Sequence, residues 1–127
     1  MCLLVSSLRL TPLFISPAHR FSLPELLSGY IFHTVLLERK PETTAEEVEA
    51  AMAFVRALPQ KIEGITNVVA GANLHTSPKN HGYTHGFILV FDTEEHFRAY
   101  APHPDHQPVS QALRRISQTI VDFDLQE

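Results

Sequence analysis

The chain has 127 residues, of which 44% are apolar and 19% are charged, so it suits one globular domain and wholesale disorder is not expected. Its net charge of −4 offers no basic surface for nucleic acid, and no apolar run is long enough to span a membrane. The single Cys2 excludes an internal disulfide, and the lack of a CxxC motif argues against structural zinc. We therefore expect a cytoplasmic protein without nucleic-acid or membrane partners.

The first 29 residues differ in composition from the rest of the chain. They contain Arg9 and Arg20 but no acidic residue before Glu25, and their apolar runs are short. We expect residues 1–29 to be an extension that is disordered or loosely packed, and residues 30–127 to form the domain. An acid-poor leader with serine and arginine is also loosely similar to an organelle-targeting segment, which is the alternative for this region.

The first element of the domain is a strand over residues 30–38, a short stretch rich in β-branched and aromatic residues. Alternation places His33, Val35 and Leu37 on one face. Because both faces are mostly apolar, we expect both to be covered. His33 is therefore predicted to be buried or to line a cavity. A buried histidine that is merely satisfied by its neighbours is the commoner case.

A helix follows, and its start is marked by the capping-box pattern of Thr44 and Glu47. Its apolar residues recur at helical spacing and define one buried face: Val48, Ala51, Met52, Val55 and Leu58. Pro59 is expected to end it. This helix is predicted to be scaffold.

Two further strands are predicted over residues 65–74 and 83–91, joined by a turn-rich loop. Gly71 inside the first of them suggests a bulge or a close approach. In the second, alternation places one histidine at the end of a strongly apolar face, which comprises Tyr83, His85, Phe87, Leu89 and Phe91.

A second helix is capped by Asp92 or Thr93 and ends near Tyr100. After a bend, Val109, Leu113 and Ile116 mark a third helical face, and residues 119–125 alternate as the last strand. The order β-α-β-β-α-β, with the second helical segment split, predicts an α+β fold of ferredoxin-like topology with a four-stranded antiparallel sheet.

The bend over residues 100–106 has the residues for proton transfer without a metal or cofactor. It contains Tyr100, His103 and His106, and two prolines stiffen the backbone between them. Histidine titrates near neutrality, and tyrosine can donate or accept a hydrogen bond. The simpler interpretation is a turn between two helices, with both histidines on the surface.

These residues resemble the stress-responsive A/B barrel domain (Dabb) family over residues 31–125. The resemblance rests on His33 in the first strand, the Gly-Tyr-Thr-His run that ends at His85, and Tyr100 followed by His-Pro-Asp-His. It implies a homodimer in which two sheets close into a dimeric α+β barrel. The pattern is also similar to the plant polyketide (olivetolic acid) cyclase branch of the family.

The cyclase resemblance implies roles for six residues and no cofactor or metal. His106 would be the catalytic base and Tyr100 its hydrogen-bonding partner, acting on a small apolar or ketide-like ligand. His33 and His85 would orient the substrate in a cavity between sheet and helices, and Phe87 and Leu89 would form its walls. Whether the chain is an enzyme stays open: the alternative is a non-catalytic, stress-responsive dimer that binds a small molecule or is structural. A third, weaker interpretation is a heme- or oxygen-dependent monooxygenase with His106 as the axial ligand.

Overall fold

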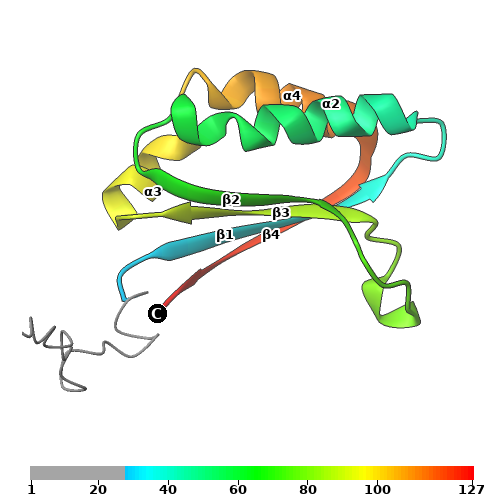
Figure 1. Cartoon of the computed structure of the whole chain (residues 1–127), viewed down its shortest axis with the longest axis horizontal. Coiled ribbons are helices and arrows are strands. Elements are labelled where there is room, and N and C mark those ends of the chain that lie inside the picture. The colour runs from blue at the N-terminus through cyan, green and yellow to red at the C-terminus, as the bar shows by residue number, and fades with distance from the viewer. Residues whose placement is uncertain (1–27) are drawn as a thin grey trace, which may run out of the picture.

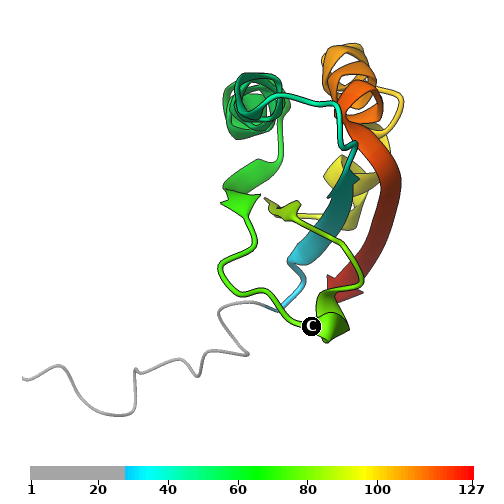
Figure 2. The ribbon, with the colours of Figure 1, turned by 90° about the vertical axis from the view of Figure 1, so that its right-hand side faces the viewer.

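The computed structural model describes residues 28–127, which form a four-stranded antiparallel sheet with helices on one face (Figures 1 and 2). The strands are β1 (Ile31–Arg39), β2 (Ile65–Ala72), β3 (His85–Phe91) and β4 (Ser117–Gln126). Their spatial order is β2-β3-β1-β4. With the helices between them, this order confirms the predicted ferredoxin-like α+β fold.

Three α-helices connect the strands: α2 (Ala45–Arg56), α3 (Glu94–Tyr100) and α4 (His106–Ile116). Short 3₁₀ turns follow α2 at Leu58–Gln60 and precede β3 at Pro78–Asn80. Figure 2 shows α2 and α4 side by side over the sheet. None of the helices in the described part of the chain is long and apolar enough to cross a membrane.

Side-chain caps start the first two helices where the sequence predicts them. The Thr44 hydroxyl accepts a hydrogen bond from the Glu47 N–H, and the Glu47 carboxylate accepts one from the Thr44 N–H, so the capping box is complete. Thr93 caps α3 by accepting from the His96 N–H. These caps fix where each helix begins and hence which of its faces meets the sheet.

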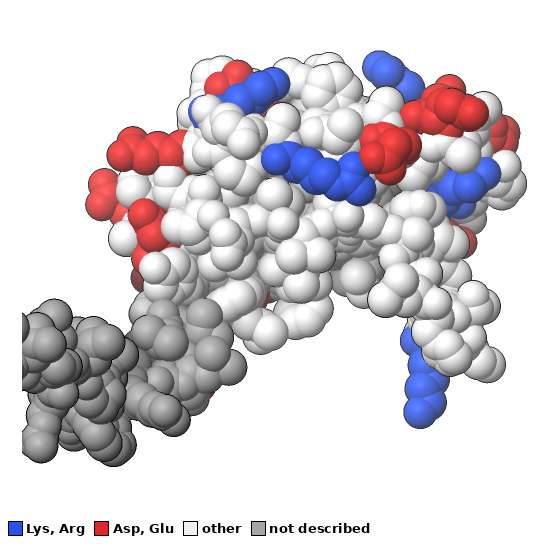
Figure 3. Space-filling model, in the orientation of Figure 1, with Lys and Arg blue, Asp and Glu red and all other residues white. Residues whose placement is uncertain are grey.

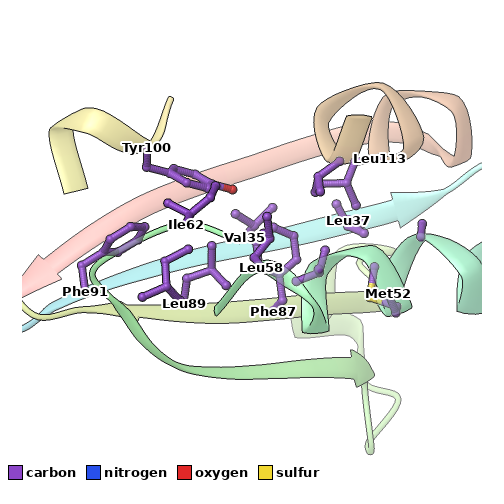
Figure 4. Packing of buried hydrophobic residues seen from close by; sticks show 14 of the residues in the cluster. Val35, Leu37, Met52, Leu58, Ile62, Phe87, Leu89, Phe91, Tyr100 and Leu113 are labelled. Carbon is purple, nitrogen blue, oxygen red and sulfur yellow. The ribbon is translucent and has the colours of Figure 1, made fainter. Parts of the chain in front are cut away.

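The core fills the space between the helices and the sheet (Figure 4). The predicted inward face of β1 is confirmed, because Val35 and Leu37 are buried and His33 is only 9% exposed. Met52 and Val55 of α2 are almost completely buried in this layer. On the β4 side of this layer the packing leaves a cavity, which extends from His33 to Ile120, the cross-strand partner of Leu37.

The opposite face of the sheet has no helix over it. Cross-strand partners share a face, so the register of the four strands brings apolar residues together there. Those that are more than a third exposed are Leu36, Val69, Ile88, Val121, Phe123 and Leu125. The charged side chains visible in Figure 3 lie mostly over the helices and the ends of the sheet, and few lie along its underside.

Details of β2 and β3 differ from the sequence-based expectations. Strand β2 ends at Ala72 instead of residue 74, and strand β3 begins at His85 instead of residue 83, so Tyr83 lies in the loop between them. The register shift of β2 falls between Ile65 and Asn67, and nothing lies within 4 Å of a Cβ placed on Gly71, so the bulge predicted there is wrong. The predictions for residues 1–27 lie outside the described residues.

Candidate functional site

A cavity of about 330 Å³ lies between the sheet and the helical pair α3–α4. This volume is at the lower end of the range of about 300–1,000 Å³ that is typical of small-molecule sites. Its walls combine apolar and polar side chains from β1, β3, β4, α3 and α4. The lining residues are His33, Val35, Phe87, Tyr100, His106, Ser110, Leu113, Arg114, Ile120 and Asp122.

The bend between α3 and α4 brings Tyr100 and His106 together. Tyr100 is the last residue of α3 and His106 the first of α4. Two backbone hydrogen bonds close the turn, from the His103 N–H to the Tyr100 carbonyl and from the His106 N–H to the His103 carbonyl, both of 3.0 Å. The phenol and imidazole rings of Tyr100 and His106 have centroids 4.3 Å apart. The sequence spacing therefore produces a direct ring contact at the cavity.

The hydrogen bond of His106 to the backbone determines which of its ring nitrogens can act as a base. Nδ1 lies 3.0 Å from the carbonyl oxygen of Ala101, and a carbonyl oxygen can only accept. Nδ1 therefore carries the proton in the neutral ring, and the lone pair is on Nε2. A half-buried histidine in this tautomer can take a proton through Nε2.

Tyr100 is suited to donate a hydrogen bond rather than to act as a base. Its side chain extends from α3 into the core layer (Figure 4), and the residue is 4% exposed. Burial raises the pKa of the phenol well above its ordinary value of 10.0, so the hydroxyl stays protonated at neutral pH. No hydrogen bond joins this hydroxyl to another group among the described residues, so it is free to donate to a ligand carbonyl.

His33 is held at the floor of the cavity by a carboxylate from the neighbouring strand. Its Nδ1 lies 2.6 Å from Oδ1 of Asp124, its directly opposed partner on β4. Because the ionised carboxylate can only accept, Nδ1–H donates, and Nε2 is the free ring nitrogen. The ring also meets Tyr100 edge to face, with centroids 5.5 Å apart. His33, Tyr100 and His106 thus form a continuous row of rings.

Of the other predicted site residues, Phe87 lines the cavity, but Leu89 and His85 do not. Leu89 is opposite His33 on β3 and is fully buried in the closed core. His85 is opposite Leu37, four residues along β1 from His33, which corresponds to about 13 Å along the strand. The structure therefore does not bring His85 to the other site residues, although it shares their face of the sheet.

His85 lies in a different environment, at the far end of the sheet. Its Nδ1 lies 2.9 Å from the hydroxyl oxygen of Thr84. Burial lowers the pKa of its ring, and the positive charge of Arg39 lowers it further. The predicted roles of His85 and Leu89 as substrate contacts stay predictions, without support from the lining of this cavity.

The sequence-based reasoning missed the contribution of β4 to the site. Ile120 and Asp122 line the cavity, and Asp124 holds His33. The signal was present in the alternation of residues 119–125, which puts the aspartates on one face and Val121, Phe123 and Leu125 on the other. Arg114 was assigned only to the helix terminus, although it also lines the cavity.

The described residues contain no group of three or more His, Cys, Asp or Glu side chains that could hold a metal ion. The polar side chains that line the cavity, among them His33, Tyr100 and His106, can form hydrogen bonds, and the histidines can transfer protons. What the arrangement can do chemically is to accept a proton at Nε2 of His106 and to donate a hydrogen bond from the Tyr100 hydroxyl, at a cavity with both apolar and polar walls.

Comparison with known proteins identifies a sequence family and several solved structures with a similar fold. A family model described as the stress responsive A/B barrel domain matches residues 31–127. A dimeric ferredoxin-like protein of unknown function from Jannaschia sp. CCS1 is 29% identical, with a TM-score of 0.69, and the match covers 78% of this chain and 100% of that one. No curated protein matches the sequence significantly.

Two more distant structures share the fold and carry enzyme names. The hydroxynitrile lyase from Passiflora edulis is 15% identical with a TM-score of 0.69, and the match covers 76% of this chain and 91% of the lyase. SnoaB, a cofactor-independent oxygenase from Streptomyces nogalater, is 18% identical with a TM-score of 0.63, covering 79% and 94% respectively. At these identities the likeness is one of fold alone.

Proposed function

The chain belongs to the stress responsive A/B barrel domain family, and from this premise we propose that it is a cofactor-free enzyme of the polyketide-cyclase type. The reaction is the intramolecular aldol closure of a small ketide. The observation that carries the proposal is the pairing of His106 and Tyr100 on one cavity, with Nε2 of the histidine and the hydroxyl of the tyrosine both free of partners in the described part of the chain.

In the proposed reaction His106 is the general base. Its Nε2 takes a proton from the carbon between two carbonyl groups of the ketide, which breaks the C–H bond and leaves an enolate. The Tyr100 hydroxyl donates a hydrogen bond to the enolate oxygen and so stabilises the developing charge. The enolate carbon then forms a C–C bond with a carbonyl carbon of the same chain, and the resulting alkoxide takes the proton back from His106.

The surroundings of this pair support acid–base chemistry on an apolar molecule. Val35, Phe87 and Leu113 form apolar walls that can hold a ring or a short alkyl chain. His33, fixed by Asp124, is proposed to orient the substrate through its Nε2. The enzyme names of the Passiflora and Streptomyces proteins show only that proteins of this fold include enzymes.

The apolar outer face of the sheet supports a homodimer. Such a face, with Val69, Phe123 and Leu125 half or more exposed, is larger than isolated surface residues would give. The related Jannaschia protein is dimeric. We therefore infer that a second copy packs on this face, on the side of the sheet opposite the cavity, so that each subunit keeps its own site.

The test is turnover of a linear poly-β-ketide thioester by wild type and by His106→Ala. Loss of the base should lower the rate by a factor on the order of 10² to 10⁴ while size-exclusion chromatography shows an unchanged dimer. His103→Ala is the matched control, because His103 lies in the same bend but does not line the cavity. Full turnover by His106→Ala, or an equal loss in His103→Ala, contradicts the assignment.

A second candidate function is a non-catalytic dimer that binds a small molecule or is structural. It is favoured by the internal hydrogen bonds of both cavity histidines, since His33 and His106 are each satisfied through Nδ1. In that case His33→Ala and His106→Ala would both lower the melting temperature, and wild type would show no turnover. The cyclase proposal instead requires wild type to turn the substrate over, and His106→Ala to lose this rate while it still folds as a dimer.

A further inference from the structure

One face of α4 presents a row of polar side chains to the cavity. His106, Ser110 and Arg114 all line it, and they are spaced four residues apart. Residues at this spacing lie on one side of a helix, and eight residues span about 12 Å along the axis. The proposed base is therefore at one end of the row, and a guanidinium group is at the other.

Arg114 carries a positive charge that no side chain neutralises within the described residues. Arg56 forms an ion pair with Glu49, and Arg98 pairs with Glu94, but no ion pair within 4.0 Å includes Arg114. Asp122 lines the same cavity from β4, yet it is not within this distance of the guanidinium. The charge of Arg114 thus remains available to a molecule that occupies the cavity.

The rest of the cavity is unlike the Arg114 end. Val35, Phe87 and Leu113 give it apolar walls, and the Tyr100 and His106 rings close the other end. A molecule that fits both parts is amphipathic, with an apolar ring or chain and one anionic group. The anionic group lies about 12 Å from the reacting carbon, which is the length of the row. A carboxylate suits the planar fork of a guanidinium, which binds it through two parallel hydrogen bonds.

We propose that Arg114 is the anion-binding residue of this cavity and selects ligands that carry a carboxylate on an apolar body. This inference rests on the proposed function, since it names the substrate class of the same site. Arg114 binds and orients the carboxylate end, so that the apolar part lies beside Tyr100 and His106. Asp122 opposes this binding by like-charge repulsion and so limits its strength.

Arg115 is the matched control for Arg114. Both arginines are exposed, both lie in the last turn of α4, and both are placed to interact with the helix dipole. Only Arg114 lines the cavity. A role of Arg114 that is limited to the helix terminus would therefore be shared by Arg115, whereas an anion-binding role would not.

The experiment is calorimetric titration with two probes that differ by one group: a resorcinol whose alkyl chain ends in a carboxylate, and the same alkylresorcinol with a methyl group in place of that carboxylate. Wild type should bind the acid roughly tenfold or more tightly than the neutral probe. Arg114→Gln should abolish this preference and leave the affinity for the neutral probe unchanged. Arg115→Gln should keep the preference, and Asp122→Asn should increase it.

The inference is overturned if wild type binds the two probes equally, if neither probe binds, or if Arg115→Gln loses as much preference as Arg114→Gln. Failure of the inference can be told apart from failure of the proposed function. Turnover that depends on His106 but is indifferent to Arg114 leaves the cyclase proposal standing and removes the carboxylate. A preference for the acid without any turnover does the reverse and indicates a binding protein.

Discussion

Two histidine–aspartate pairs in this protein have the same bond length and different surroundings. In the cavity pair, His33 Nδ1 lies 2.6 Å from Asp124 Oδ1, and in the surface pair His96 Nδ1 lies 2.6 Å from Asp92 Oδ1. The side chain of His33 is 11% exposed and that of His96 is 30% exposed. The bond alone therefore does not mark a functional site.

The pairs also differ in how the chain builds them. His96 and Asp92 are four residues apart, across the start of α3, so local helical geometry brings them together. His33 and Asp124 are 91 residues apart and meet only because β1 and β4 pair in one register. The cavity pair lies among aromatic rings and contacts Tyr100, whereas the surface pair has the carboxylates of Glu63 and Glu95 as further charged neighbours. A binding or catalytic site therefore needs an enclosed space as well as suitable side chains.

Breaking the backbone beside the surface pair should have the largest effect on stability. Gly64 has a φ of +92°, and a Cβ there would lie 2.3 Å from Cβ of His96. Gly64→Ala should cost on the order of 2–3 kcal/mol, because left-handed strain and a clash against a helix add together. Chemical denaturation measures this.

The control separates the two contributions. Gly29 also has a positive φ, of +84°, but nothing lies within 4 Å of a Cβ placed there. Gly29→Ala should therefore cost only about 1 kcal/mol from the backbone strain. Equal losses in the two variants would show that the contact of Gly64 with His96 contributes nothing.

Breaking the cavity pair should have the next largest effect. Asp124→Ala leaves the buried Nδ1–H of His33 without its acceptor, which should cost about 1–3 kcal/mol. Asp124→Asn keeps an acceptor oxygen and should lose less. Denaturation midpoints measure both, and turnover should fall in Asp124→Ala if His33 orients the substrate. A fully stable Asp124→Ala variant would contradict the view that the pair holds the cavity floor.

The surface pair should give a smaller effect, which depends on pH. The hydrogen bond to Asp92 raises the pKa of His96 above its ordinary value of 6.5, and the same bond lowers the pKa of Asp92 below 3.8. A raised histidine pKa stabilises the fold below pH 6.5, and this is lost as the pH rises through the folded value. A lowered aspartate pKa stabilises it above pH 3.8, and this is lost as the pH falls through the folded value.

The stabilisation by this pair is therefore greatest between these two values. His96→Gln should lower the melting temperature most near about pH 5 and less above about pH 8. His75→Gln serves as the control, because this exposed loop histidine forms no ion pair within the described residues. A difference between wild type and His96→Gln that does not change with pH would rule out the charged pair as its source.

Much of the fold could be predicted because its signals are local. The capping residues Thr44 and Thr93, the helical spacing from Val48 to Val55, and the alternation of β1 each act within one element. Their order then leaves few topologies, since short connections favour antiparallel neighbours. The closeness of Tyr100 and His106 was predictable for the same reason, because a stiff bend of a few residues joins them.

The rest of the site depends on pairing between distant segments. His33 and His85 share a face of the sheet, yet the register of β1 and β3 places them near opposite ends of it. Leu89 and Phe87 also share that face, but helices cover the first, whereas the second reaches the cavity. Alternation assigns a face to each of these residues and says nothing about what covers them.

Local patterns in the amino-acid sequence therefore predict the elements, their order, the inward faces and the Tyr100–His106 pair, because these follow from local geometry and short connections. The folded arrangement was needed to show that Asp124 is the partner of His33, that Arg114 and Asp122 line the cavity, and that His85 is not among its lining residues. The physical reason is that a cavity is space left between packed elements. Its lining depends on the register of strands and on the positions of helices that no single segment specifies.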